Sequence, residues 1–160
     1  MSFREYLREV LDKPYKWKWG LDKEFATFTT RVGDIYTIDF YESYTDDDNT
    51  IFDITFSRNK DKDSDIDMSI TGTGDSFRVF ATVKEVIKDF LNYIKKRDDF
   101  KAIMYSAKEK SRIRLYDTLS KKLVNDTYLT GYKKIRVHDF VLWRGQKPKN
   151  LNKYLGYFNM

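Results

Sequence analysis

The segment SFRVFATVKEVIKDFLNYIKK, residues 76–96, repeats its apolar side chains every three or four positions. The apolar positions are Phe77, Phe80, Val83, Ile87, Phe90, Leu91 and Ile94. This spacing places them in one broad stripe along a helix, which is typical of a helix that packs against a sheet. We therefore expect a long central helix over residues 76–96 that covers one face of a sheet.

The segments that flank this helix have the patterns of further strands and of a second helix. Residues 66–70 and 100–106 are expected to be strands, and residues 111–124 have helical spacing. The inward face of the second helix is expected to contain Ile113, Tyr116, Leu119, Leu123 and Val124. Residues 132–143 are expected to form one long strand that includes His138.

The N-terminal half predicts a short helix followed by strands with alternating apolar residues. Residues 2–12 have an amphipathic helical pattern, and Tyr15, Trp17 and Trp19 are expected to face the core from a strand over residues 15–20. Three further strands are expected at residues 25–31, 35–41 and 51–57. The inward side chains of the last strand are expected to be Phe52, Ile54 and Phe56.

Together these elements predict an α+β fold with a mixed, mostly antiparallel central sheet flanked by helices. With 160 residues, the chain is long enough for one domain with a substantial core. We assign residues 1–145 to this domain and residues 146–160 to a C-terminal arm, which is basic and aromatic without clear periodicity. The exposed aromatic side chains expected in the arm predict self-association into a homo-oligomer.

The composition excludes several classes of protein. The chain has no Cys and one His, so it cannot hold a disulfide, a thiolate zinc site or a multi-His metal centre, and no metal site is predicted. No apolar run approaches the ~18 residues of a membrane span, and the start MSFREYLREV lacks the apolar stretch of a signal peptide. We expect a soluble cytoplasmic protein that does not bind membranes.

The charge is divided unevenly along the chain. Residues 1–75 contain 10 Lys and Arg against 17 Asp and Glu, whereas residues 76–160 contain 20 against 8. A basic C-terminal half can present a positive face to nucleic acid or to an acidic protein, or the two halves can simply attract each other. The sequence leaves these alternatives open.

Residues 71–76, TGTGDS, join an expected strand to the central helix through a Gly-x-Gly turn. Glycine allows a close backbone approach, and the unpaired N–H groups of a helix start bind phosphate. With this turn, the order of elements over residues 25–143 resembles that of the GNAT family of N-acetyltransferases. The resemblance implies a GNAT-like fold in which acetyl-CoA would be contacted by Gly72, Thr73, Gly74 and Arg78.

The same resemblance implies roles for residues further along the chain. Leu115 and Tyr116 match the family's Leu-Tyr pair, so Tyr116 would be the general acid, and Gly131 with Tyr132 approximates the family's Gly-Phe. The residues do not decide the general base, for which the alternatives are Asp53, Asp39 and Glu42.

Two positions depart from the family's pattern. Ser69 stands where the family has Gln or Arg. Asp75 places a carboxylate at the start of the central helix, where it would repel a pyrophosphate. These departures favour a protein that has the fold without the catalytic activity, and no cofactor is predicted unless the protein is an enzyme that uses acetyl-CoA.

The segments GTGDSFRVFATV and SAKEKSRIRLYD are also similar to uncharacterised proteins encoded by tailed bacteriophages. The positions that carry this similarity are Phe77, Arg78, Ser111, Arg112 and Tyr116. The similarity implies a viral origin and attaches no activity.

Three functions remain as hypotheses. The first, which we favour, is a non-catalytic binding or scaffold module that uses its basic half against an acidic partner. The second is a divergent acetyl-CoA-dependent N-acetyltransferase. The third is a nucleic-acid-binding protein in which aromatic side chains interleaved with lysines stack on bases. The predicted partner-binding or nucleic-acid-binding residues are Trp17, Trp19, Arg112, Arg114 and Lys121.

Overall fold

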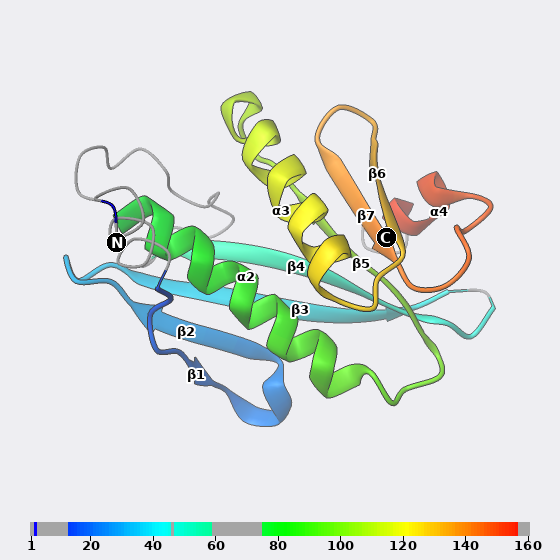
Figure 1. Cartoon of the computed structure of the whole chain (residues 1–160). Helices are drawn as coiled ribbons and strands as arrows, with labels where there is room; N and C mark the ends of the chain where they lie inside the picture. The colour runs from blue at the N-terminus through cyan, green and yellow to red at the C-terminus, as the bar shows by residue number, and fades with distance from the viewer. Residues whose placement is uncertain (1, 3–12, 46, 59–74, 157–160) are drawn as a thin grey trace.

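A computed structural model of the chain describes residues 2, 13–45, 47–58 and 75–156 (Figure 1). These residues form an α+β fold around a seven-stranded, mostly antiparallel sheet, as the sequence predicts. Some predictions fall wholly or mostly outside the described residues, namely the helix over residues 2–12, the strand over residues 66–70 and the glycine turn over residues 71–76, of which only residues 2, 75 and 76 are described.

The sheet is mixed because one pair of neighbouring strands is parallel. Its strands are β1 Lys18–Trp19, β2 Phe25–Thr29, β3 Ile35–Tyr44, β4 Thr50–Arg58, β5 Phe100–Ser106, β6 Gly131–Ile135 and β7 Asp139–Trp143. Their order is β1-β2-β3-β4-β5-β7-β6, and only β4 and β5 are parallel. Two parallel strands need a crossover connection, so the chain crosses the sheet between β4 and β5.

Helix α2 (Asp75–Ile94) lies in this crossover, and α3 (Ile113–Asp126) follows β5 and the 3-10 turn η2 (Lys110–Arg112). Both helices cover the same face of the sheet, with α2 over the strands β2 to β4 and α3 over the β5 and β7 side (Figure 1). The predicted central helix and second helix are therefore confirmed, with ends within two residues of the expected ones.

The main hydrophobic core lies between these helices and the sheet. Phe52, Ile54 and Phe56 of β4 face it, as predicted. The ring of Phe90 from α2 stacks on Phe40 of β3 with 3.9 Å between the ring centroids. Burial of these large apolar side chains is the main favourable term in the stability of the fold.

Phe77 is an exception within the predicted apolar stripe of α2. Its side chain is 51% exposed, whereas that of Val79 is buried. Two positions along a helix correspond to a rotation of about 200°, so a helix that buries Val79 turns Phe77 away from the sheet. The expectation that Phe77 packs in the core is wrong.

A smaller core covers the other face of the sheet around β5 and β7. The short helix α4 (Leu151–Gly156) contributes Leu151 and Tyr154 to it, and they pack with Trp143 of β7. Helix α4 of the predicted arm is thus packed on the sheet through Leu151 and Tyr154. Self-association through the arm stays a prediction, and residues 157–160 lie outside the described residues.

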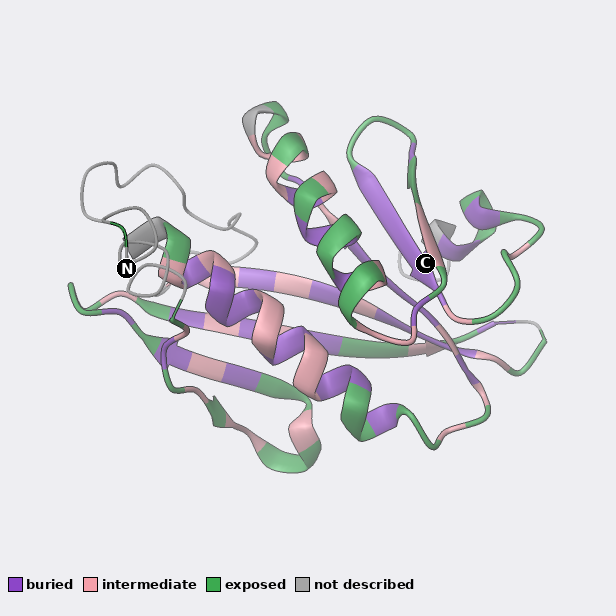
Figure 2. Cartoon of the chain, in the orientation of Figure 1, coloured by how far each residue is buried: buried purple, intermediate pink, exposed green. Residues whose placement is uncertain are grey.

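The expected long strand over residues 132–143 is wrong, because this segment forms the β6–β7 hairpin. Residues 136–138 form the turn, and Arg136 has a left-handed backbone with a φ of 55°. His138 lies exposed in this turn rather than on a strand. Strand β7 is buried along its whole length and lies between β5 and β6 (Figure 2).

Strands β4 and β5 pair over only part of their length. Residues 50–53 pair with residues 100–104, after which the two strands diverge (Figure 1). Aromatic rings fill the wedge on the helix side, where Phe56 stacks on Tyr116 with 5.8 Å between centroids and Tyr105 packs against both rings. The divergence is therefore stabilised by packing.

The substitution Gly131→Ala is expected to destabilise the fold by about 1–3 kcal/mol. A Cβ atom at this position would lie 2.6 Å from the buried ring of Trp143, so the ring or strand β6 would have to move. Urea denaturation measures the loss. In a Trp143→Phe background the smaller ring should make Gly131→Ala less costly. An equal cost in both backgrounds would show that contact with Trp143 is not the cause.

Candidate functional site

Of the residues predicted to contact acetyl-CoA, Arg78 lies within the described chain and residues 72–74 lie outside it. Arg78 Nε donates to the carbonyl oxygen of Lys13 at 3.0 Å, and its guanidinium carbon lies 3.7 Å from the ring centroid of Tyr15. Arg78 thus fastens the segment before β1 to α2. This contact explains the orientation of Arg78 without a phosphate.

Tyr116, the predicted general acid, is fully buried in the main core. Its ring packs against Phe56, Tyr105 and Phe140. A general acid must come within hydrogen-bond reach of the leaving atom, and here aromatic rings surround the side chain. The structure therefore gives Tyr116 the environment of a core residue.

The sheet separates the candidate general bases Asp39 and Asp53 from Tyr116. Each of them lies next to a strand residue that enters the main core, and successive side chains of a strand alternate between its two faces. Asp39 and Asp53 therefore point away from α2 and α3. Glu42 lies on the helix side, where its Oε1 is 2.7 Å from Nη2 of Arg97. These residues do not come together with Tyr116 in one site.

Trp17 and Trp19, predicted to contact nucleic acid or a partner, pack against the main core. Trp19 Nε1 donates to Asp89 Oδ2 of α2 at 2.7 Å, and its ring lies 5.7 Å from that of Phe40. The predicted inward orientation is confirmed, although the strand itself is limited to Lys18–Trp19. Both indoles are held by intramolecular contacts.

The basic residues predicted to act with these indoles lie elsewhere in the fold. Arg112 belongs to η2, and Arg114 and Lys121 belong to α3. In Figure 1, α2 lies between these elements and β1. The structure therefore does not bring the five predicted binding residues together.

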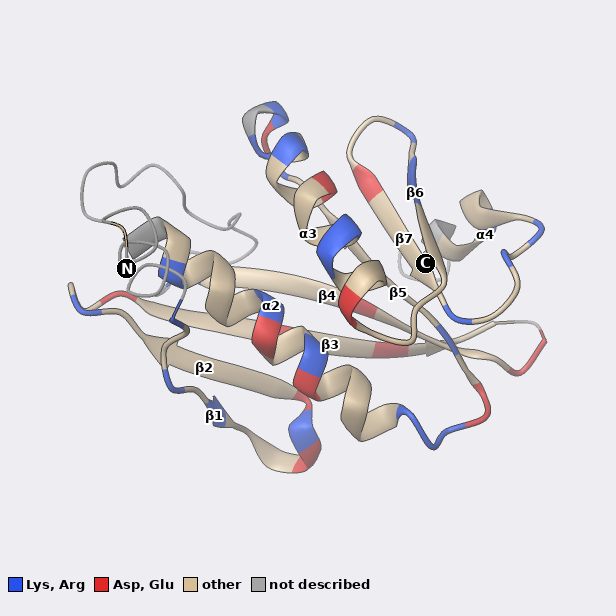
Figure 3. Cartoon of the chain, in the orientation of Figure 1, with Lys and Arg blue, Asp and Glu red and all other residues tan. Residues whose placement is uncertain are grey.

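The part of the molecule built by residues 100–156 is strongly basic, with 14 Lys and Arg against 4 Asp and Glu. Figure 3 shows these cations on α3, on β6 and on the segment that leads into α4. The exposed ones are Lys108, Lys110, Arg114, Lys121, Lys122, Lys133, Lys134, Arg136, Lys147, Lys149 and Lys153. We call this set the basic face; it surrounds the end of the molecule formed by β5, β6 and β7, because α3 and α4 lie on opposite faces of the sheet there.

A cleft of about 540 Å³ opens at the C-terminal end of α2, between the edge of β3 and the 3-10 turn η1 (Leu21–Lys23). Exposed rings of Phe25, Tyr41 and Tyr93 line it. Its charged lining residues are Asp22, Lys23, Glu24, Asp39, Glu42 and Arg97. The sequence does not predict this cleft, because its lining residues come from five separate elements and from the loop with Arg97, and no local motif connects them.

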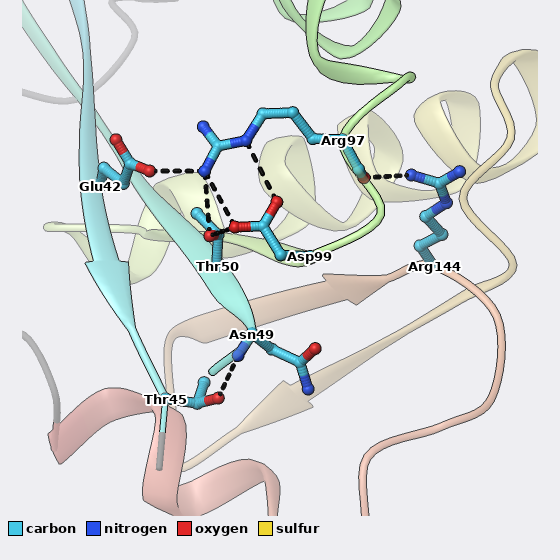
Figure 4. A network of polar contacts seen from close by, with 7 residues as sticks. All are labelled: Glu42, Thr45, Asn49, Thr50, Arg97, Asp99 and Arg144. Carbon is cyan, nitrogen blue, oxygen red and sulfur yellow. Dashed lines mark hydrogen bonds and ion pairs between the residues drawn. The ribbon is translucent and has the colours of Figure 1, made fainter. Parts of the chain in front are cut away.

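Arg97 lines one side of the cleft and is held there by a network of hydrogen bonds (Figure 4). Its Nη2 donates to Glu42 Oε1 at 2.7 Å and to Asp99 Oδ2 at 3.1 Å, and its Nε donates to Asp99 Oδ1 at 3.2 Å. Thr50, at the start of β4, accepts from Arg97 Nη2 at 3.0 Å and donates its hydroxyl proton to Asp99. The network joins β3 and β4 to the chain that enters β5.

Backbone contacts connect this network to the basic half of the molecule. Arg144, just after β7, donates from Nη1 to the carbonyl oxygen of Arg97 at 3.0 Å (Figure 4). At the other end, the Thr45 hydroxyl accepts the Asn49 N–H at 3.1 Å in the β3–β4 turn. The position of the cleft wall is therefore fixed by contacts from both halves of the chain.

Their surroundings shift the pKa values of Asp99 and Asp39 in opposite directions. Hydrogen bonds from Arg97 and Thr50 lower the pKa of Asp99, and the hydrogen bond to Asp99 raises the pKa of Arg97. Partial burial raises the pKa of Asp39, which has no cationic partner among the described residues. Asp39 is thus a carboxylate in the cleft whose charge is not compensated by the described part of the chain.

No protein-family model matches the sequence, and no curated protein matches it. None of the helices formed by the described residues combines the length and the apolar character needed to cross a membrane. The same residues contain no group of three or more His, Asp or Glu side chains placed to hold a metal ion.

The substitution Asp99→Asn is expected to flatten the acid limb of the stability profile. The pKa of Asp99 is lowered by folding, so its contribution is fully present above its unfolded pKa of about 3.9 and is lost as the pH falls through the lower folded pKa. Urea denaturation from about pH 7 to about pH 2 measures the profile. Its exposed neighbour provides the control, Asp98→Asn, which should keep the wild-type slope. Identical slopes for all three proteins would contradict the assignment.

Proposed function

We propose that this chain is a non-catalytic binding module whose basic face holds an acidic protein partner. The proposal rests on the eleven exposed cations of residues 100–156, a region with only four carboxylates. Surface cations that are concentrated in one part of a fold attract a partner of opposite charge and speed its association.

Two observations favour binding over acetyl transfer. Tyr116 is enclosed by aromatic rings, and the candidate bases Asp39 and Asp53 lie on the opposite face of the sheet. We retain the GNAT relationship as part of the proposal, since the observed order of strands, α2, β5, α3 and a closing hairpin is compatible with it. A shared scaffold does not require a shared reaction, because one fold can host many functions.

The packing of the two indoles favours an acidic protein over single-stranded nucleic acid. Bases stack on exposed ring faces, whereas Trp17 and Trp19 pack against the main core. The proposal places the protein in the cytoplasm of a bacterial host, in keeping with the bacteriophage resemblance. The absence of cysteine fits such a reducing compartment, where disulfides are rare.

The triple variant Arg114→Glu, Lys133→Glu and Lys134→Glu is expected to bind an acidic polypeptide at least ~10-fold more weakly than the wild type. The three residues are exposed on α3 and on the edge strand β6, which contact each other. Fluorescence anisotropy of labelled poly-glutamate at low salt measures the affinity. A single-stranded oligonucleotide of equal length is the competing probe and should bind less tightly than poly-glutamate.

The matched control is the triple variant Lys16→Glu, Lys18→Glu and Lys96→Glu, which changes the net charge equally at exposed positions outside the basic face. It should retain most of the affinity. Equal weakening by both triple variants would overturn the proposal, because only the total charge would then matter. If the oligonucleotide bound more tightly than poly-glutamate and Trp17→Ala abolished that binding, nucleic-acid binding would replace the proposed function.

Acetyl-CoA at millimolar concentration is expected to leave the unfolding midpoint unchanged. A ligand at 100 times its Kd stabilises the folded state by about 2.7 kcal/mol, which raises the midpoint by several degrees. Differential scanning fluorimetry of the wild type and of Gly74→Trp makes this comparison. A shift in the wild type that Gly74→Trp abolishes would favour the acetyltransferase in place of the binding module.

A further inference from the structure

Among the described residues, no strand covers the outer edge of β3 where the cleft lies. Strand β2 pairs with β3 over residues 35–39, and Phe40 N–H then donates to the carbonyl oxygen of Glu24 at 2.9 Å. β3 continues to Tyr44 and pairs there with β4 on its inner side. No other strand of the described chain pairs with residues 41–44 on the outer side. Such an edge can accept an added strand through its backbone N–H and C=O groups.

Exposed apolar side chains concentrate at this edge. Tyr41 is 54% exposed and Tyr93 is 49% exposed, and both line the cleft together with Phe25. Leu21 of η1 and Tyr44 at the end of β3 are exposed as well. Of the nine large apolar side chains exposed in the described chain, three line the cleft, and Leu21 and Tyr44 lie within two residues of a lining residue in the sequence. Such a concentration of exposed apolar side chains is typical of an interaction site.

The cleft also has negative charge that its own cations do not neutralise. Arg97 is shared between Glu42 and Asp99. Lys23 lies 3.8 Å from Asp89 of α2 and over the ring of Tyr93, 4.9 Å from its centroid. The cleft carboxylates without a cationic partner among the described residues are Asp22, Glu24 and Asp39. A basic ligand is therefore favoured over an acidic or a neutral one.

Asp39 and two aromatic rings share one face of this edge. Phe25 of β2 is directly paired with Asp39 of β3, and Tyr41 is two positions further along β3. Side chains of directly paired residues, and of residues two apart on a strand, lie on the same face of a sheet. The Phe25 ring lies over Gly20, so it leaves Asp39 open on this face. A carboxylate that shares a strand face with aromatic rings can offer an ammonium or guanidinium group both an ion pair and a ring contact.

We propose that this cleft binds an extended peptide that adds to the β3 edge and places a Lys or Arg side chain beside Asp39, on the face that also carries Phe25 and Tyr41. Alternate side chains of the added strand face Tyr93 on the α2 side. The site goes beyond the proposed function, because its partner is a basic peptide and the basic face takes an acidic one.

The probe is a fluorescein-labelled heptapeptide of alternating valine and lysine, and binding is followed by anisotropy at low salt. We expect saturable binding that is at least ~10-fold weaker for the same peptide with glutamate in place of lysine. N-methylation of two adjacent central amides removes a donor from each edge of the peptide and should also weaken binding at least ~10-fold. A purely electrostatic contact would not respond to this methylation.

Asp39→Asn in the full chain should weaken binding of the lysine peptide by about 10-fold. Its unfolding midpoint should stay the same or rise, since burial disfavours the charged form of Asp39, so misfolding would not explain the loss. Tyr41→Ser removes one ring from this face and should weaken binding as well. The matched control is Asp47→Asn, an exposed carboxylate outside the cleft, which should bind like the wild type.

Equal affinity of Asp39→Asn and Asp47→Asn, or of the lysine and glutamate peptides, would overturn the proposal. A dimer of the chain that Asp39→Asn dissociates would also overturn it, since a second copy would then be the occupant. The basic-face variant with Arg114, Lys133 and Lys134 changed to Glu should bind the lysine peptide at least as tightly as the wild type. Failure of this proposal can therefore be told apart from failure of the proposed function.

Discussion

The parallel pairing of β4 with β5 joins parts of the chain that are far apart in sequence. Residues 50–53 meet residues 100–104, so the intervening chain must cross the sheet, and this crossing places α2 over β3. Between α2 and β5, at the end of this crossover, Arg97 forms ion pairs with Glu42 and Asp99. The main core, the divergence filled by aromatic rings and the cleft at the end of α2 all depend on this one pairing.

Residue spacing predicted the elements that bury a single face. Helix α2 and the inward side chains of β4 follow from periodicity alone. Periodicity does not predict the β6–β7 hairpin, because β7 is buried on both faces and residues 136–138 contain none of the usual turn residues. The basic face was predictable as a charge imbalance. The cleft was not, since residues 22–42 and Arg97 meet only through sheet register and the crossover.

The basic face and the cleft differ in charge and in the kind of contact they offer. The basic face consists of exposed cations, among them those on α3, β6 and the segment before α4, which suit an electrostatic contact without a fixed geometry. The cleft combines a strand edge, aromatic rings and Asp39, which require a defined backbone direction and register. A hydrogen bond from Arg144 Nη1 to the carbonyl oxygen of Arg97 connects the chain after β7 to the wall of the cleft.

In the part of the chain that the structure describes, helices cover both faces of the sheet around β5 and β7, which lie between α3 and α4. Among the described residues, β2 and β3 have a helix on one face alone. We expect amide hydrogens of β5 and β7 to exchange with solvent only through large-scale unfolding, and those near the β3 edge to exchange through small local openings. We therefore expect the β3 edge to open more readily than the part of the sheet around β5 and β7, so that a strand can be added at this edge without opening that part.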